Sequence, residues 1–444
     1  MRRATYPQLS FTAPFTDHFL YNELCEIDRL LDANPQVVAL AHEDLVRDID
    51  PAKGRPGMTS EQVLRILVLM QTQQHTYDEL SFHLNDSPVY RWFCRLDCSQ
   101  QVKKSSMQRN IKKLRSETLE AISGHIVRYA MSQGIEKCRK VRTDCTGVET
   151  TIHTPSDSSL LYDSVRVLTR LLKEAHRCVP SIQSSDHCRR AKRRMVGIQY
   201  ARHNSRREPL YIDLLKVTRK TVGYAERAVA SLNEEKSDKA KNLSIKLLHY
   251  IALAKQVISQ TQRRVLDRES VPAAEKVVSI FEPHSDIIVK DGRETLYGHK
   301  VCLTSGASGL IIDGKILDGN PADSTLAVEM IDRLRDTYDK VPRQATFDGA
   351  FCSKDNLAAL KSIGVHDVAF SKRRGIEIED MAKSKRVYKR LRNFRAGIEA
   401  TISFLKRKFA LGCCTWRGLA SFQSYVWSSI LAANLVLLAR QATA

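Results

Sequence analysis

Three features are missing from this 444-residue sequence, and each absence excludes a class of protein. The first residues contain no apolar run of signal-peptide length, so we expect no secretory leader. The longest apolar segment, residues 419–438, is interrupted by serines, glutamine and asparagine, which favours a buried helix over a membrane span. Eleven cysteines in a chain this long do not form a small disulfide scaffold, and no CxxC pair indicates a metal site, so free, mostly buried thiols are expected. Cys94 and Cys98, with His75 and His83, offer only a weak alternative as a zinc site.

Acidic residues are scarce relative to basic ones. Fifty Asp and Glu stand against 70 Lys and Arg, which gives a formal net charge of +20. Such an excess favours a polyanionic partner, because each phosphate that a cation neutralises releases condensed counterions. A membrane surface is also anionic, but without a membrane segment we expect a cytoplasmic protein with no membrane partner. The length predicts several domains, each with its own core.

Residues 1–133 are predicted to form a helical N-terminal domain. Capping boxes at 59–62 and 76–79 and a cap with proline at 87–88 indicate three short helices, after one amphipathic helix near 20–31. This spacing is typical of a helix-turn-helix bundle that binds DNA, and equally of a plain packing or dimerisation module. A longer helix is expected over 105–133, with several cations near its start.

A large helical insertion is predicted over 161–270, after a Val- and Thr-rich strand at 138–152 that contains Asp144. Long amphipathic helices are expected at 160–175, 211–232 and 239–265. A basic cluster lies between the first two, comprising Arg189, Arg190, Lys192, Arg193, Arg194, Arg202, Arg206 and Arg207. Because the planar guanidinium matches phosphate oxygens, we interpret Arg189, Arg190, Arg193 and Arg194 as contacts to a nucleic-acid backbone rather than a solvated face.

Strand signals return after residue 271. Strands are predicted at 277–281, 286–290, 298–304 and 309–317, followed by a helix at 324–336. A further strand over 344–351 carries Asp348, and a helix at 354–363 leads to a last strand at 367–370. This order predicts a parallel crossover joined to an antiparallel meander, hence a mixed sheet of the α/β (α+β) class. We assign 134–160 and 271–418 to this core and 419–444 to a C-terminal helix that packs on it.

Three acidic residues stand out by position. Asp144 and Asp348 lie on strands that are expected to be neighbours, and Glu399 lies on a helix between Arg395 and Lys406. Clustered carboxylates repel one another unless a cation lies among them, and oxygen ligands with room for water and phosphate suit Mg²⁺. Two ions about 4 Å apart would activate an attacking hydroxyl and stabilise the leaving oxygen of a phosphodiester. Arg395 and Lys406 are expected to neutralise DNA phosphates.

The pattern of Asp144, Asp348 and the Arg-x3-Glu-x6-Lys helix resembles the DDE transposases of bacterial insertion sequences, closest to the ISNCY-type group. The specific stretches are 142–153, 157–160, 281–288, 298–301 and 395–408. The sequence differs from many relatives in carrying Arg392 and Phe351 where these have tyrosine, so the role of the first tyrosine is not transferred.

The resemblance implies a ribonuclease H-like core and metal-dependent cleavage of transposon ends with strand transfer to target DNA. It implies that Asp144, Asp348 and Glu399 bind Mg²⁺ or Mn²⁺, and that the double-stranded DNA partners are terminal inverted repeats and target DNA. A homodimer or higher oligomer on bacterial nucleoid DNA is expected. Two alternatives stay open from the sequence: a nuclease that cuts without joining, and a catalytically inactive DNA-binding regulator derived from a transposase.

Overall fold

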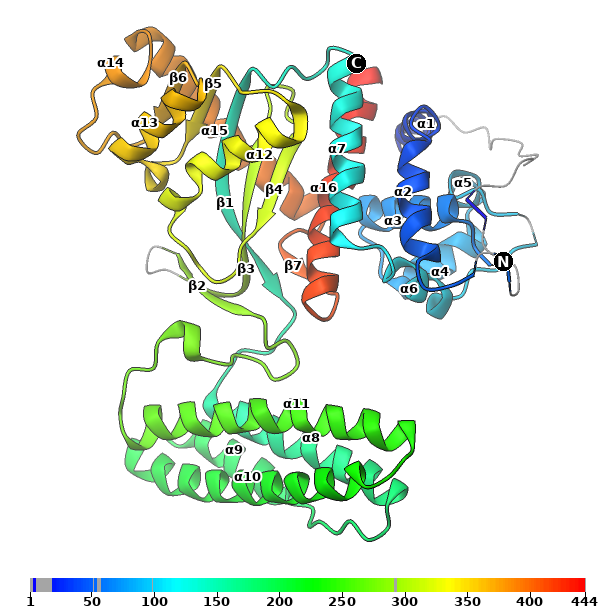
Figure 1. Cartoon of the computed structure of the whole chain (residues 1–444), viewed down its shortest axis with the longest axis vertical. Helices are drawn as coiled ribbons and strands as arrows, with labels where there is room; N and C mark the ends of the chain where they lie inside the picture. Colours follow the sequence, from blue (N-terminus) through cyan, green and yellow to red (C-terminus); the bar gives the residue numbers. More distant parts are fainter. Residues whose placement is uncertain are drawn as a thin grey trace. The chain divides into compact units, whose positions relative to one another are not determined.

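The computed structural model describes residues 3–4, 18–50, 52–53, 57–97, 99–290 and 294–443. The chain divides into two compact units. The sheet unit consists of Met1–Glu149 and His299–Ala444, and the helical unit of Thr150–Gly298. The helical unit is therefore an insertion in the sequence of the sheet unit (Figure 1). The finer division at residues 133, 160, 270 and 418 remains a prediction.

The N-terminal part of the sheet unit is helical, as predicted. Its helices are α1 (Phe19–Asp32), α2 (Gln36–Val46), α3 (Ser60–Gln73), α4 (Tyr77–Asp86), α5 (Pro88–Phe93), α6 (Lys104–Ile111) and α7 (Ser116–Ser132). Both capping boxes form, with Thr59 opening α3 and Thr76 opening α4. Ser87 caps α5, with Pro88 in its first turn. These local signals fix where the helices begin.

The single helix predicted over 105–133 is wrong, because the chain is interrupted between α6 and α7. Arg115 adopts an extended backbone and precedes α7. Its backbone N–H donates to Asp44 Oδ2 at 2.8 Å, and its Nε donates to Oδ1 at 2.6 Å. The Asp44 side chain is fully buried, so it has to be hydrogen-bonded. A contact 71 residues away along the chain therefore overrides the helical periodicity.

Arg65 of α3 is buried among three carboxylates of the N-terminal helices. Its Nη1 donates to Asp28 at 2.6 Å, its Nη2 to Asp32 at 2.6 Å and its Nε to Glu61 at 2.9 Å. Arg95 adds a second cation, with Nη2 at 2.9 Å from both Asp28 and Asp32. All three guanidinium nitrogens of Arg65 thus have partners, and we name these five side chains the Arg65 cluster.

The seven-stranded sheet is mixed. Its strands are β1 (Lys140–Thr150), β2 (Asp286–Lys290), β3 (Glu294–Ser305), β4 (Ile311–Ile316), β5 (Gln344–Phe347), β6 (Asp367–Phe370) and β7 (Cys413–Cys414). The order is β2-β3-β1-β5-β6, with β4 paired to β3 and β7 paired to β1. β5 pairs in parallel with both β1 and β6, whereas β3 pairs antiparallel with β2 and β4. The predicted mixed, ribonuclease H-like sheet is confirmed.

The strand predicted at 277–281 does not form. The backbone N–H of Val277 donates to Gln260 Oε1 at 2.9 Å, and Gln260 Nε2 donates back to the Val277 carbonyl at 3.1 Å. Val277 and Ile280 are buried in the core of the helical unit. A side chain thus takes the hydrogen bonds that a neighbouring strand would have made.

Five helices complete the sheet unit: α12 (Ala327–Tyr338), α13 (Lys354–Ile363), α14 (Ile378–Met381), α15 (Lys385–Lys408) and α16 (Leu419–Thr443). Within the described ranges, α16 is the one helix long and apolar enough to cross a membrane, but 89% of its most apolar window is buried. Asn434 of α16 binds both the backbone N–H and the carbonyl of Ile311 in β4. It is therefore a core helix, as predicted.

The helical unit has a core of its own. Its long helices are α8 (Asp157–Cys178), α9 (Cys188–Tyr200), α10 (Asn204–Asn233) and α11 (Asp238–Thr261), and α11 continues as a π-helix, Gln262–Leu266. Leu161, Leu214 and Leu247 are fully buried between these helices. The three predicted long helices are confirmed, and the start of the basic cluster forms a fourth helix, α9.

Candidate active site

β1 and β5 bring Asp144 and Asp348 to neighbouring positions. The parallel ladder runs from Lys140 opposite Gln344 to Thr143 opposite Phe347, so each aspartate directly follows the last paired residue. Parallel strands of one sheet direct equivalent positions to the same edge. The expectation that these two strands are neighbours is confirmed.

Helix α15 carries the third acidic residue and a guanidinium that contacts all three. Arg395 Nη2 lies 3.0 Å from Asp144 Oδ2 and 3.2 Å from Asp348 Oδ1. Its Nη1 lies 2.9 Å from Glu399 Oε1, one helical turn further along. We name these four side chains the Arg395 cluster. The structure therefore places the three predicted acidic residues around one cation.

The Asp348 carboxylate is held in place from several sides. Ser371 Oγ donates to its Oδ1 at 2.7 Å. Burial raises the pKa of Asp348, but the hydrogen bonds from Ser371 and the backbone N–H groups of Gly349 and Ala350, together with the Arg395 charge, lower it by more. Its pKa therefore lies below the ordinary value, and the group is ionised at neutral pH.

Arg142 fixes α15 against β1, beside the cluster. Its Nη1 donates to the Phe394 carbonyl at 3.2 Å and its Nη2 to Thr401 Oγ1 at 3.2 Å, and its guanidinium lies over the Phe394 ring. Gly397 makes this possible, since a Cβ there would lie 1.9 Å from Arg142 Nη1. These contacts flank Arg395 on both sides along the helix and set the position from which it reaches the carboxylates.

Lys406 lies on the same side of α15 but contacts a different part of β1. Its Nζ donates to the Gly147 carbonyl at 2.9 Å. This contact is three residues beyond Asp144 along the strand. Of the two cations predicted to flank Glu399, Arg395 contacts the carboxylates and Lys406 contacts the backbone of the neighbouring strand.

The four arginines predicted to contact DNA all lie on α9, but they are not equivalent. Arg190 and Arg194 both bind Asp213 of α10, where Arg194 Nε lies 2.6 Å from Asp213 Oδ2. Arg189 and Arg193 are exposed and form no ion pair within the described parts of the chain. Of these four arginines, only Arg189 and Arg193 are therefore available to bind a phosphate of another molecule.

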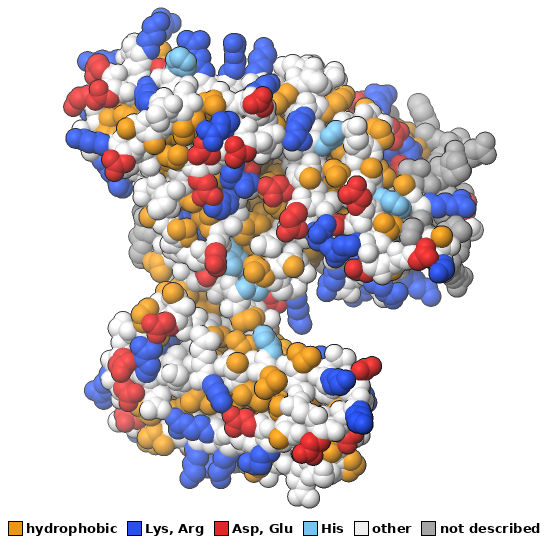
Figure 2. Space-filling view, in the orientation of Figure 1, with side chains coloured by type: hydrophobic (Ala, Val, Ile, Leu, Met, Phe, Trp, Pro, Cys, Tyr) orange, Lys and Arg blue, Asp and Glu red, His pale blue; other side chains and the backbone are white. Residues whose placement is uncertain are grey.

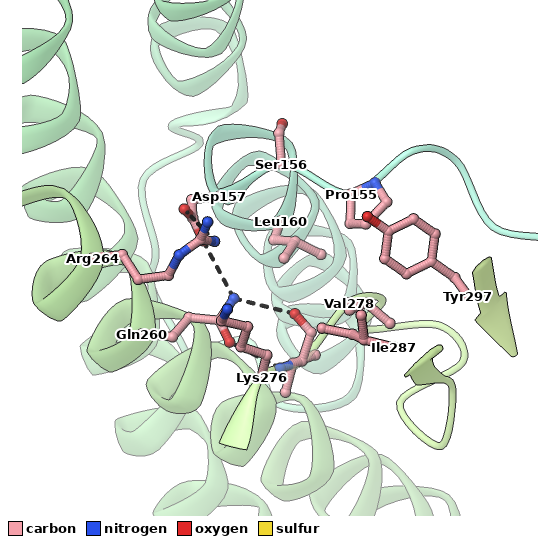
Figure 3. A pocket seen from close by; sticks show the side chains of 11 residues that line it. Pro155, Ser156, Asp157, Leu160, Gln260, Arg264, Lys276, Val278, Ile287 and Tyr297 are labelled. Atoms are coloured by element: carbon pink, nitrogen blue, oxygen red, sulfur yellow. Dashed lines mark hydrogen bonds and ion pairs between the residues drawn. The ribbon is translucent and has the colours of Figure 1, made fainter. Parts of the chain in front are cut away.

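The helical unit contains a cavity of about 200 Å³ between α8, α11 and the segment before β2. Figure 3 shows Gln260 linked both to Asp157 and to the backbone of residue 277, with the Arg264 guanidinium next to Asp157. Arg264 Nη1 contacts both Asp157 oxygens, at 2.9 and 3.2 Å. Arg264 and Asp157 bind one another, and Gln260 connects Asp157 to the backbone of residue 277, so these wall groups hold parts of the helical unit together.

Two family models match the chain. Residues 259–435 match the Transposase DDE domain, and residues 14–113 match the Transposase domain (DUF772). The chain is an insertion-sequence DDE transposase. The first match contains Asp348, Arg395 and Glu399, whereas Asp144 lies outside both matched ranges. No curated protein and no solved structure matches the transposase.

The transposase also has a basic face that we did not assign from its sequence. Eight exposed cations follow Ser371 or lie on the first half of α15: Lys372, Arg373, Arg374, Lys385, Arg386, Lys389, Arg390 and Arg392. Lys and Arg side chains crowd this end of the sheet unit in Figure 2, near α14 in Figure 1. Within the described residues only Arg373 has an acidic partner, Glu377, at 3.9 Å. The run Lys-Ser-Lys-Arg-Val-Tyr-Lys-Arg at 383–390 is the signal that identifies this face in the sequence.

This basic face adjoins the carboxylates. Ser371, which binds Asp348, directly precedes Lys372, and the Lys372 stem packs on Gly349. Burial lowers the pKa of Lys140 on β1, and the nearby cations Arg390 and Arg142 lower it further. Positive charge is therefore concentrated beside the three acidic side chains.

Proposed function

We propose that this transposase cleaves the ends of its own element and transfers them to target DNA in a reaction that depends on Mg²⁺ or Mn²⁺. The observation that carries the proposal is the meeting of Asp144, Asp348 and Glu399 at one guanidinium, from two strands and a helix. Three carboxylates that tolerate one another around a cation are a suitable ligand set for hard divalent ions.

Asp144, Asp348 and Glu399 would hold the divalent ions, two in number. When bound, such ions activate the attacking hydroxyl and stabilise the leaving oxygen of a phosphodiester. Asp348 is oriented for this role by Ser371 and by two backbone N–H groups, and it is ionised without any metal. Arg142 holds α15 so that Glu399 faces β1.

DNA is proposed to follow the basic face at the start of α15, because these cations adjoin the carboxylates and, among the described residues, lack acidic partners apart from Arg373. Arg189 and Arg193 of α9 would add a second phosphate contact. We also propose that the protein works as a homodimer or higher oligomer on its two terminal repeats, in the cytoplasm on nucleoid DNA.

The test of the reaction is a plasmid that carries the element's own flanking DNA, incubated with purified protein and Mg²⁺ or Mn²⁺. We expect cleaved ends and joined products with the native protein, and neither product in EDTA. Glu399→Gln preserves the side-chain volume and should lose both products while it retains DNA binding. Cleavage by this variant at a rate close to that of the native protein contradicts the assignment of Glu399. Cleavage without joining by the native protein supports the nuclease alternative.

The test of the DNA path is the salt dependence of binding. Replacing Lys385, Arg386, Lys389 and Arg390 by Gln should reduce the slope of log K against log salt concentration by about 4, since each lost phosphate contact contributes about 0.9. Replacing Arg189 and Arg193 should reduce it by about 2. Replacing Arg190 and Arg194 is the matched control and should change it least, because Asp213 already pairs with both. An unchanged slope in the first variant contradicts the proposed path.

A further inference from the structure

The structure assigns Arg395 a role in the free protein that differs from binding a phosphate. We propose that its guanidinium occupies the divalent-cation site, gathers the three carboxylates there, and has to leave before metal binds. This inference rests on the metal-dependent function proposed above. It concerns the order of events at the site rather than the chemistry itself.

The three carboxylates are spaced for a guanidinium and not for a metal ion. Arg395 nitrogens lie 2.9–3.2 Å from one oxygen of each carboxylate. Mg²⁺ requires its oxygen ligands at about 2.1 Å, so two oxygens on one ion lie within about 4 Å of each other. Among the residues that the structure describes, no three acidic, His or Cys side chains are arranged to hold a metal ion in this conformation. The carboxylates are thus gathered around the guanidinium but not closed around a smaller ion.

The Arg395 cluster also carries more negative than positive charge. Three carboxylates share one guanidinium, so the four side chains together carry two negative charges when the acids are ionised. A divalent ion therefore compensates the carboxylates better than the single charge of Arg395 does. The exchange releases an arginine whose planar fork fits phosphate oxygens. Metal binding and phosphate binding by Arg395 should then favour each other.

Arg395 is only partly held by hydrogen bonds. Its Nε is buried and has no hydrogen-bond partner in the part of the chain that the structure describes, which is unfavourable for an N–H group. The Glu399 side chain is 65% exposed, so it moves at little cost in packing. Arg142 meanwhile fixes the backbone of α15 at Phe394 and binds Thr401. The guanidinium can therefore swing away while the helix that carries Glu399 stays in place.

The experiment is a titration of the full-length protein with MnCl₂ in the absence of DNA, followed by calorimetry. Arg395→Met removes the internal cation but keeps an unbranched side chain, and we expect it to bind Mn²⁺ about tenfold more tightly than the native protein does. Its metal-free melting temperature should fall, and saturating Mn²⁺ should restore it. Arg395→Lys keeps the charge without the fork and should lie between the two. If Arg395→Met folds poorly, the Mn²⁺ affinity of Arg395→Lys is compared with that of the native protein instead.

A short DNA duplex added to the same titration provides a second readout. It should tighten Mn²⁺ binding by the native protein and leave Arg395→Met unchanged, because the coupling passes through the guanidinium. Equal Mn²⁺ affinity in native and Arg395→Met proteins overturns the exchange alone. Absence of Mn²⁺ binding in both proteins, or binding that survives Glu399→Gln unchanged, overturns the metal-dependent function and the exchange with it.

Discussion

The Arg65 cluster and the Arg395 cluster contain the same types of side chain but differ in burial, hydrogen bonding and net charge. Each places one arginine among three carboxylates. In the Arg65 cluster the central side chain is 2% exposed, Nε and both terminal nitrogens have partners, and Arg95 supplies a second positive charge. In the Arg395 cluster the central side chain is 16% exposed, Nε has no partner among the described residues, and one cation binds three acidic side chains.

The difference shows what separates a structural ion cluster from a candidate active site. A second arginine, which leaves one excess negative charge instead of two, and complete hydrogen bonding of Arg65 make the Arg65 cluster a fixed contact between α1, α3 and α5. Excess negative charge and an incompletely bonded arginine leave the Arg395 cluster able to accept another cation. Counting carboxylates alone does not distinguish the two, whereas counting cations and unused donors does.

The largest expected effect follows from Arg65→Met. Removing the central cation leaves Asp28 and Glu61 buried without their main partner, which costs about 3–5 kcal/mol of unfolding free energy. Urea unfolding of the full chain, followed by circular dichroism, measures this loss. Arg395→Met is the matched variant, and its loss should be smaller and reversible by Mn²⁺. Equal losses in both variants would remove the distinction between the clusters.

Replacing one carboxylate in each cluster should separate stability from activity. Glu399→Gln relieves excess negative charge, so we expect unchanged or higher stability without metal and a loss of cleavage on the order of 10²–10³-fold. Glu61→Gln should lower stability by about 1–3 kcal/mol and leave the cleavage rate of the folded fraction unchanged. Thermal melts and single-turnover cleavage measure both. A Glu61→Gln variant that is stable but inactive would contradict this comparison.

Gly397→Ala tests whether Arg142 positions the Arg395 cluster. The added methyl displaces the Arg142 guanidinium, which lies 1.9 Å from the ideal Cβ position. Losing its hydrogen bonds to α15 should cost about 1–2 kcal/mol and reduce cleavage. In an Arg142→Ala background the same substitution should cost little, since nothing is left to displace. Additive effects in this double-mutant cycle would show that the two residues act separately.

The smallest effect concerns a balanced pair in the helical unit. Hydrogen bonds from Arg190 and Arg194 lower the pKa of Asp213 to about 2, although partial burial of the carboxyl opposes this shift. A carboxyl whose pKa is depressed by folding stabilises the protein above its unfolded pKa, near 4, and loses this contribution as pH falls toward 2. Asp213→Asn should therefore cost about 1 kcal/mol at pH 7 and much less at pH 2. Hydrogen exchange of α9 and α10 measures it, and a pH-independent cost would contradict the assignment.

Much of the fold could be predicted because its signals are local. The capping residues Thr59 and Thr76 fix two helix starts, and the Val and Thr content around Asp144 indicates a strand. The neighbouring positions of Asp144 and Asp348 follow from strand order and the crossover rule.

The remaining features depend on contacts between residues far apart in the chain. Asp44 interrupts the helix that periodicity predicts over 105–133. Gln260 forms the backbone hydrogen bonds that a strand at 277–281 would have made with a neighbouring strand. The sequence indicates that Arg395 lies near Glu399, but its contact with Asp144 spans 251 positions. The pairing of Arg190 and Arg194 with Asp213 could not be predicted from the sequence either, because a count of charged residues does not show which cations already bind an acidic side chain.

Affinity cleavage by iron tests whether Asp144, Asp348 and Glu399 bind a divalent cation at the place that Arg395 occupies. Fe²⁺ substitutes for Mg²⁺ at oxygen sites, and with ascorbate it cuts the backbone next to its ligands, so mass spectrometry of the fragments locates the bound ion. We predict cuts beside Asp144, Asp348 and Glu399 that Mg²⁺ suppresses and Arg395→Met strengthens, with none beside Asp28 or Glu61. If the Arg65 cluster is cut as strongly as the Arg395 cluster, or if no cut occurs beside the three predicted ligands, the proposed metal site is contradicted.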